Sequence, residues 1–213
     1  MEQNLICIGL IGKYCSGKDT AANMIMRYFN TQLYGEGFTG KIFSTDQKYD
    51  ELSQLIYHNT GTLKDRLNWR KALSVMGKST LVGSLFYESL LFSQLDHGGK
   101  RPVAIINSVE TEEQAEDWLR FIPNKTHFIY IRSDLETRFK NHNSRKFDPD
   151  SIEEFREICK TYGDTHIGSL RRYAGPTNIA ANIGFREKHI SDLDGLYNLQ
   201  KGIYAILDDI VLK

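Results

Sequence analysis

One segment near the start of the sequence constrains the fold more than any other. Residues Gly12 to Thr20 read G-K-Y-C-S-G-K-D-T, with two glycines and a lysine in the spacing G-x-x-x-x-G-K. An apolar run, Leu5 to Ile11, precedes the segment, and apolar residues at helical spacing follow it as far as about Tyr34. The segment is therefore predicted to be a tight turn that leads from a buried strand into a helix.

A turn of this spacing, between a strand and a helix, is typical of loops that bind nucleoside triphosphates. Glycine allows backbone N–H groups to turn inward around phosphate oxygens, and the start of the helix adds partial positive charge. The lysine is expected to reach the outer phosphates. The residues predicted to contact the nucleotide are Gly12, Lys13, Tyr14, Cys15, Ser16, Gly17, Lys18, Asp19 and Thr20.

Asp19 stands directly after the lysine, where serine or threonine is expected. A hydroxyl at that position normally helps to hold Mg²⁺. A carboxylate is also a hard oxygen ligand, so Asp19 could hold the ion directly or through water. The alternative is that Asp19 is only an acid favoured by the positive end of the helix dipole.

The rest of the chain alternates apolar runs with helical patterns, which predicts βαβ units around a parallel sheet in one domain, residues 1–213. The nearly all-apolar run at 102–109 should be a buried central strand. Further strands are expected at 41–44, 127–131 and 178–183. Helices are expected at 18–34, 46–58, 67–76, 79–95, 111–121, 152–162 and 193–212, with another that starts at 134.

Charge and cysteine usage argue against several classes of partner. Lys+Arg and Asp+Glu are balanced at 27 each, so no overall basic field would attract nucleic acid or an anionic membrane. The sequence has no apolar run of membrane-spanning length. Its three cysteines, Cys7, Cys15 and Cys159, lack metal-ligand spacing and are read as reduced thiols of a cytoplasmic protein.

Other polar residues fall where an acceptor substrate would bind. Asp46 follows the second expected strand, at the sheet edge where ligands of parallel α/β proteins sit. It could orient an acceptor hydroxyl or act as a base, or it could simply cap the next helix. Arg66 and Arg70 are four residues apart on one helical face, so they could bind an acceptor phosphate or be solvated surface charges.

A local basic cluster lies later in the chain and comprises Arg138, Lys140, Arg145 and Lys146. Phosphoryl transfer needs cations against the charge of the moving group, and a closing lid can supply them. We therefore expect a lid at about 138–150, with a solvated charged turn as the alternative. Asn182 closes the last expected strand and could border the base of the nucleotide.

Two sets of residues resemble known families. Ser16 to Thr20, S-G-K-D-T, resembles the phosphate loop of phage deoxynucleoside monophosphate kinases, and animal phosphomevalonate kinases carry a similar S-G-K-D loop. Later segments resemble dephospho-CoA-kinase-like P-loop proteins. These segments are Arg138-Phe139, Asn143 to Phe147, Asp148, Glu153-Glu154-Phe155, Gly168 and Ala181-Asn182.

The resemblance implies an α/β, three-layer P-loop NTPase fold of the nucleoside monophosphate kinase type. Such a fold has a five-stranded parallel sheet, a pair of acceptor-binding helices and a mobile basic lid. It also implies ATP, Mg²⁺ and phosphoryl transfer to a small phosphorylated acceptor such as a (deoxy)nucleoside monophosphate. Lys18 would then bind the outer phosphates, Asp46 would orient the acceptor, and Arg138 and Arg145 would close over the transferred group. A homodimer is left open.

The third expected strand departs from the pattern of these families. Where they run I-I-D-S-V-R, this chain has Ile105 to Glu110, I-I-N-S-V-E. Asn107 keeps an oxygen but lacks the charge, and Glu110 replaces the arginine. Either the metal is held differently, by Asp19, or catalytic power is reduced and the chain is a nucleotide-binding sensor. If Asn107 is a degraded carboxylate position, Asn107→Asp should raise the rate of transfer.

Overall fold

The computed structural model describes residues 5–31, 37–44, 85, 88–143, 151–161, 164–182 and 192–212. In this part of the chain the strands form a sheet of five, in the order β2-β3-β1-β4-β5, and every neighbouring pair is parallel. The strands are β1 (Ile6–Gly12), β2 (Phe38–Ser44), β3 (Arg101–Asn107), β4 (Thr126–Arg132) and β5 (Ile179–Ala181). The strand that leads into the glycine-containing turn is therefore central.

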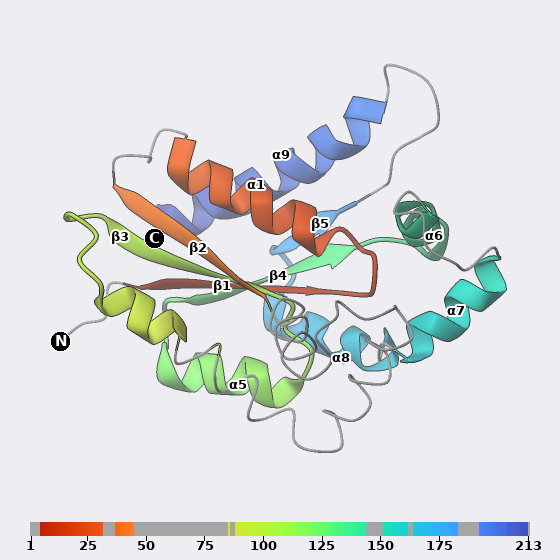
Figure 1. Cartoon of the computed structure of the whole chain (residues 1–213), viewed down its shortest axis with the longest axis horizontal. Helices are drawn as coiled ribbons and strands as arrows, with labels where there is room; N and C mark the ends of the chain where they lie inside the picture. The colour runs from red at the N-terminus through yellow and green to blue at the C-terminus, as the bar shows by residue number, and fades with distance from the viewer. Residues whose placement is uncertain are drawn as a thin grey trace, which may run out of the picture.

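Helices cover both faces of the sheet (Figure 1). One face carries α1 (Lys18–Thr31) and α9 (Asp192–Val211), and the other carries α5 (Glu112–Phe121) and α8 (Asp164–Ala174). Two more helices, α6 (Leu135–Asn143) and α7 (Ile152–Thr161), lie beyond the end of the sheet at which β1 finishes. The chain thus places helices at the edge where parallel α/β proteins bind ligands.

Alternation along β1 explains how one strand serves both layers. Ile6, Ile8 and Leu10 are buried in the cluster that includes α1 and α9, whereas Cys7 and Ile11 are buried in the cluster that includes α5 and α8. Successive side chains of a strand point to opposite faces, so a strand covered on both faces is apolar throughout. The two packed layers hold the end of β1, and the turn that follows it, in a fixed place.

The fold prediction is confirmed. Five parallel strands with helices on both faces, and a phosphate-loop sequence between the first strand and its helix, give the expected α/β, three-layer fold. Ser151 caps α7, because the backbone N–H of Glu154 donates to the Ser151 hydroxyl. The expected acceptor-binding helices and residues 144–150 of the expected lid lie outside the described residues.

One element differs from the sequence prediction. Helix α8 was not expected, although Ile167, Leu170 and Ala174 are buried at helical spacing along it. The helix expected to start at 134 is α6. It includes Arg138 to Asn143, the first part of the expected lid, and Arg138 and His142 are buried within it.

A candidate nucleotide-binding site

The turn after β1 has the backbone geometry of an anion-binding loop. Cys15 and Gly17 have φ angles of 58° and 96°, so the chain bends sharply before α1 begins. A Cβ atom on Gly17 would lie 2.5 Å from Asn182 Nδ2, so a side chain there would displace the Asn182 amide, and the positive φ disfavours one in any case. The ammonium of Lys18 donates to the Gly12 carbonyl oxygen at 2.8 Å and to that of Lys13 at 3.2 Å. The lysine therefore lies over the rim of the loop.

Three consecutive carbonyl groups of the loop accept hydrogen bonds from side chains elsewhere in the fold. The Tyr14 oxygen accepts from Arg138 Nη1 at 3.2 Å. The Cys15 oxygen accepts from Asn141 Nδ2 at 3.2 Å, and the Ser16 oxygen accepts from Asn182 Nδ2 at 2.8 Å. We call Arg138, Asn141 and Asn182 the carbonyl anchors.

The carbonyl anchors also determine where the loop's N–H groups point. No peptide bond in the described chain is cis, so each N–H lies opposite the carbonyl of the preceding residue. The N–H groups of Cys15 and Gly17 are consequently turned away from the anchors, while that of Ser16 closes a turn onto the Lys13 oxygen at 3.1 Å. Oriented N–H groups at the start of a helix bind anions without a charged side chain.

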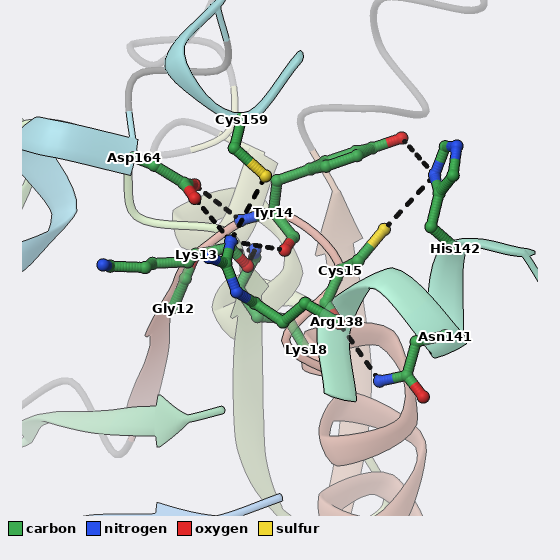
Figure 2. Close-up of polar contacts among 10 residues, drawn as sticks. All are labelled: Gly12, Lys13, Tyr14, Cys15, Lys18, Arg138, Asn141, His142, Cys159 and Asp164. Atoms are coloured by element: carbon green, nitrogen blue, oxygen red, sulfur yellow. Dashed lines mark hydrogen bonds and ion pairs between the residues drawn. The ribbon is translucent and has the colours of Figure 1, made fainter. Parts of the chain in front are cut away.

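Arg138 is held by a buried ion pair with Asp164, in the first turn of α8 (Figure 2). The same carboxylate accepts the backbone N–H of Tyr14 at 2.9 Å through its other oxygen. Arg138 and Asp164 therefore bracket Tyr14, one at its carbonyl and one at its N–H. Arg138 is only 4% exposed, so in this structure its guanidinium faces the loop from behind.

An aromatic cluster supports the same side of the loop. The buried His142 ring lies with Nδ1 3.3 Å from the Tyr14 hydroxyl and 3.8 Å from Cys15 Sγ, as Figure 2 shows. The Phe155 ring from α7 packs against His142 and Tyr14, with centroid distances of 5.2 and 6.0 Å. Such contacts restrict side-chain rotation, so the loop rests on a rigid surface.

Two buried thiols near the loop and the sheet are held in the neutral form. Burial, followed by the charge of Asp164, raises the pKa of Cys159 to about 12, and Arg138 opposes this shift. Burial also raises the pKa of Cys7 in β1. All three cysteines are free and buried. These two thiols therefore behave as apolar core groups near neutral pH.

The carboxyl end of β3 brings Asn107 to the first turn of α1. Asn107 Nδ2 donates to Asp19 Oδ1 at 2.7 Å. Asn107 is 7% exposed, and its Oδ1 atom has no hydrogen-bond partner among the described residues. The hydroxyl of Ser16, a residue only 1% exposed, also lacks a partner there. Buried polar atoms without partners are costly, so both atoms mark places where a bound group would supply hydrogen bonds.

These observations fit a divalent cation next to the phosphates. A carboxylate and an amide oxygen are the hard ligands that Mg²⁺ prefers, and Mg²⁺ usually needs only one or two protein groups besides phosphate and water. Within the described ranges no three His, Cys, Asp or Glu side chains gather into a metal-binding group. The ligands for a cation would thus be Asp19, with the neutral oxygen of Asn107 beside it.

The structure brings together most of the residues predicted from the sequence. Gly12 to Thr20, Arg138 and Asn182 lie around the same loop, and Asp19 and Thr20 are exposed at its mouth. The backbone N–H of Tyr14 is engaged by Asp164, so Tyr14 belongs to the support of the loop as well as to its surface. Asp46, Arg66, Arg70, Arg145 and Lys146 lie outside the described residues.

Sequence reasoning missed three side chains that hold the loop. Asp164 accepts from the Tyr14 N–H, Asn141 donates to the Cys15 carbonyl, and His142 contacts both residues. Asn141 and His142 lie in the region read as an exposed basic lid, and Asp164 opens the helix that was not expected. The helical spacing of the apolar residues after Asp164 was the available signal.

Solved structures of similar fold include a gluconokinase from Sinorhizobium meliloti 1021, with 13% identity over 97% of this chain and 95% of that one, at a TM-score of 0.47. A shikimate kinase from Acinetobacter baumannii, in complex with shikimate, has 13% identity over 97% of this chain and 96% of that one, also at 0.47. No protein-family model and no curated protein matches the sequence. Identities this low say nothing of the substrate.

Proposed function

We propose that this protein is a P-loop kinase that transfers a phosphoryl group from ATP to a small phosphorylated acceptor, a (deoxy)nucleoside monophosphate. The observation that carries the proposal is the loop itself. Three carbonyl anchors orient its N–H groups, Lys18 lies over its rim, and the Asp19–Asn107 pair stands at its mouth. This set of groups binds the triphosphate and leaves its terminal phosphoryl group at the open edge of the sheet.

Each residue has a role in this proposal. The loop N–H groups and Lys18 bind the inner and outer phosphates, and the positive end of the α1 dipole adds to their attraction. Asp19 and Asn107 would hold Mg²⁺, which when bound neutralises part of the phosphate charge. Asn182 donates to the Ser16 carbonyl and would border the base of the nucleotide. Asp46 would orient the acceptor, and Arg145 would come over the transferred group.

Arg138 takes a different part from the one expected of a lid arginine. Its guanidinium is buried and already bonds the Tyr14 carbonyl and the Asp164 carboxylate. It therefore acts on the phosphates through the backbone of the loop, as a positioning residue. The three free cysteines, two of them with strongly raised thiol pKa values, suit a reducing compartment such as the cytoplasm.

A second candidate function is that of a nucleotide-binding sensor that transfers phosphate slowly or not at all. Glu110 favours it, because the families that this loop resembles have an arginine at that position. In the structure the Glu110 carboxylate accepts a hydrogen bond from the Ser108 hydroxyl at 3.3 Å. A carboxylate in place of that arginine would repel a phosphorylated acceptor instead of attracting it.

One experiment separates the two functions. The protein is incubated with γ-labelled ATP, Mg²⁺ and a panel of nucleoside monophosphates, nucleosides and dephospho-CoA, with Lys18→Met as the matched control. A labelled acceptor formed by the wild type and lost in the control supports the kinase. Tight ATP binding without a labelled product supports the sensor. No binding of ATP by the wild type contradicts both.

No helix among the described residues has both the length and the apolar character needed to cross a membrane.

A further inference from the structure

The residue that follows β3, Ser108, has a backbone conformation that favours glycine. Its φ angle is 108°, and among the described residues only Cys15 and Asn124 also have a positive φ without being glycine. A side chain makes such a φ costly, so it persists only where the surrounding structure enforces it. Residues of this kind gather at functional sites, and Ser108 lies at the edge of the sheet where parallel α/β proteins bind ligands.

Contacts on both sides of Ser108 enforce its conformation. Its own N–H donates to the Ile106 carbonyl oxygen at 3.1 Å, which makes a tight turn at the end of β3. The next N–H, that of Val109, donates to the Leu10 carbonyl oxygen of β1 at 2.8 Å, and Val109 is 1% exposed. Two residues later, Thr111 caps α5 through a capping box. Ser108 thus turns the chain between a fixed strand and a fixed helix.

The hydroxyl group is what serine adds at this place, because glycine would adopt the same φ without strain. The Ser108 hydroxyl donates to the Glu110 carboxylate at 3.3 Å, and both residues are partly exposed, whereas Val109 between them is buried. Since the single hydroxyl proton goes to Glu110, Ser108 offers its lone pairs to a ligand, and a carboxylate likewise only accepts. The pair is therefore suited to a ligand group that donates a hydrogen bond.

We propose that Ser108 and Glu110 bind a sugar hydroxyl of the acceptor and so determine how the acceptor is oriented. The inference rests on the proposed function and adds to it the residues that recognise the acceptor. The charge of Glu110 disfavours a phosphate beside it and strengthens a hydrogen bond from a hydroxyl. Every nucleoside monophosphate, deoxy or not, carries at least one such hydroxyl on its sugar. The acceptor's phosphate would accordingly face Lys18 and the cation, while its sugar faces the end of β3.

The first measurement is the melting temperature of the ligand-free protein, which separates strain from the use of the hydroxyl. Ser108→Gly removes the unfavourable φ and should raise the melting temperature by about 2–4 °C. Ser108→Ala keeps the φ and loses the hydroxyl, so its melting temperature should not exceed that of the wild type. Asn124→Gly is the matched control, because Asn124 has a φ of 64° in the exposed turn between α5 and β4, at the opposite end of the sheet.

The second measurement is the affinity for acceptors, by calorimetric titration in the presence of Mg²⁺ and an unhydrolysable ATP analogue. The probes are the common ribonucleoside monophosphates and their 2′,3′-dideoxy counterparts, which lack both sugar hydroxyls. The wild type should bind the hydroxyl-bearing member of a pair about tenfold or more tightly, the usual effect of a hydrogen bond to a charged group. Ser108→Gly, Ser108→Ala and Glu110→Ala should reduce this preference to about threefold or less, whereas Asn124→Gly should keep it.

Three results would overturn the inference. The first is a Ser108→Gly protein that melts no higher than the wild type, since φ would then not be strained. The second is a wild type that binds both members of each pair equally. The third is a preference that survives unchanged in Ser108→Ala and Glu110→Ala, which would place the hydroxyl elsewhere. In the second and third cases nucleoside monophosphates still bind, so the proposed function stands. If none of them binds while Mg²⁺-ATP does, the inference fails together with the proposed acceptor.

Discussion

At the scale of single residues, the site depends on a few side chains that hydrogen bonds hold in place. Lys18 shows this most directly, because its ammonium is held over the loop by the Gly12 and Lys13 carbonyls. A bound triphosphate would compete for the same ammonium with stronger acceptors, since charge-assisted hydrogen bonds exceed those to neutral carbonyls. The lysine is thus already placed at the phosphates' expected position.

Replacing Lys18 with methionine should weaken ATP binding and leave the fold intact. The change removes a cation and contacts worth about 1.5–3 kcal/mol each, roughly ten- to a hundredfold in affinity. Calorimetric titration with Mg²⁺-ATP measures the loss, and circular dichroism checks the fold. Lys160→Met is the control, because Lys160 pairs with Glu157 on the surface of α7. Equal affinities of the wild type and Lys18→Met would contradict the assignment of the loop.

Gly17→Ala should damage both stability and binding. Its φ of 96° is unfavourable for any residue with a Cβ, at a cost of about 1–3 kcal/mol. The new Cβ would also lie 2.5 Å from Asn182 Nδ2. Chemical denaturation of Gly17→Ala, alone and combined with Asn182→Ala, separates these two causes. The combined variant should lose the steric clash but keep the unfavourable φ, so it should remain less stable than Asn182→Ala. Equal free energies of unfolding for the combined variant and Asn182→Ala would show that φ is not strained.

At the scale of elements, the loop is shaped by three helices that follow β4 in the chain. Helix α6 supplies Arg138, Asn141 and His142, α7 supplies Phe155, and α8 supplies Asp164. The part of the expected lid that the structure describes is therefore a support for the loop. Arg138, which the sequence placed in a closing lid, is buried in this support at 4% exposure.

Arg138→Met should destabilise the protein strongly. Removing one partner of a buried ion pair leaves an uncompensated buried charge, here Asp164, at a cost of about 3–5 kcal/mol. Arg172→Met is the matched control, because its pair with Glu112 is largely exposed and should contribute nothing measurable. Urea denaturation of both variants is the measurement. Similar free energies of unfolding for the two would contradict the role given to Arg138 and Asp164.

The buried thiols give a prediction about pH. Cys7 and Cys159 should resist alkylation in the native protein at about pH 8, because the thiolate is the reactive form and both pKa values are raised. Mass spectrometry with an unfolded control measures the labelling, and rapid native labelling of either residue would contradict the burial.

The raised thiol pKa values also determine the direction in which the free energy of unfolding changes with pH. Because the folded pKa of Cys159 lies above the ordinary value of 9.0, its stabilising effect is complete below that pH and is lost as pH rises toward about 12. The free energy of unfolding should fall over that interval, and less steeply in Cys159→Ala.

At the scale of the whole molecule, nucleotide binding at the loop should also stabilise the helices that support the loop. ATP binding to the loop should slow backbone hydrogen exchange in α6 and α8, since Arg138 and Asp164 bond both peptide groups of Tyr14. Exchange measured by mass spectrometry with and without an unhydrolysable ATP analogue tests this, with α5 as the internal control. Protection confined to residues 12–20 would contradict the coupling.

The sequence predicted the sheet well because its signals are local. The apolar run at 102–109 and the loop motif each announce a buried strand, and both strands are there. Strand β2 begins at Phe38. The sequence predicted a start at 41, because Gly40 interrupts the apolar pattern. A Cβ at Gly40 would lie 2.9 Å from Met26 Sδ, so the glycine reflects close packing against α1, which only the assembled fold reveals.

The site was predicted only as far as its motif extends. The loop residues could be listed from G-x-x-x-x-G-K, whereas the partners of that loop are set by tertiary contacts with no local signal. Nothing near Arg138 in the sequence indicates that its partner is Asp164 or that both would bond Tyr14. Likewise, nothing in the sequence indicates that Asn107 and Asp19 are in contact.

The long sequence separation of the loop's contacts has a consequence for the order of folding. Tyr14 bonds a residue 150 positions away, and Ser16 bonds one 166 positions away. Contacts between distant parts of a chain form late, because closing a long loop costs entropy before the contact rewards it. On a ribosome, the glycine turn is therefore made early and receives its final shape only when most of the protein has been synthesised. Nucleotide affinity would be among the last properties that a newly made molecule acquires.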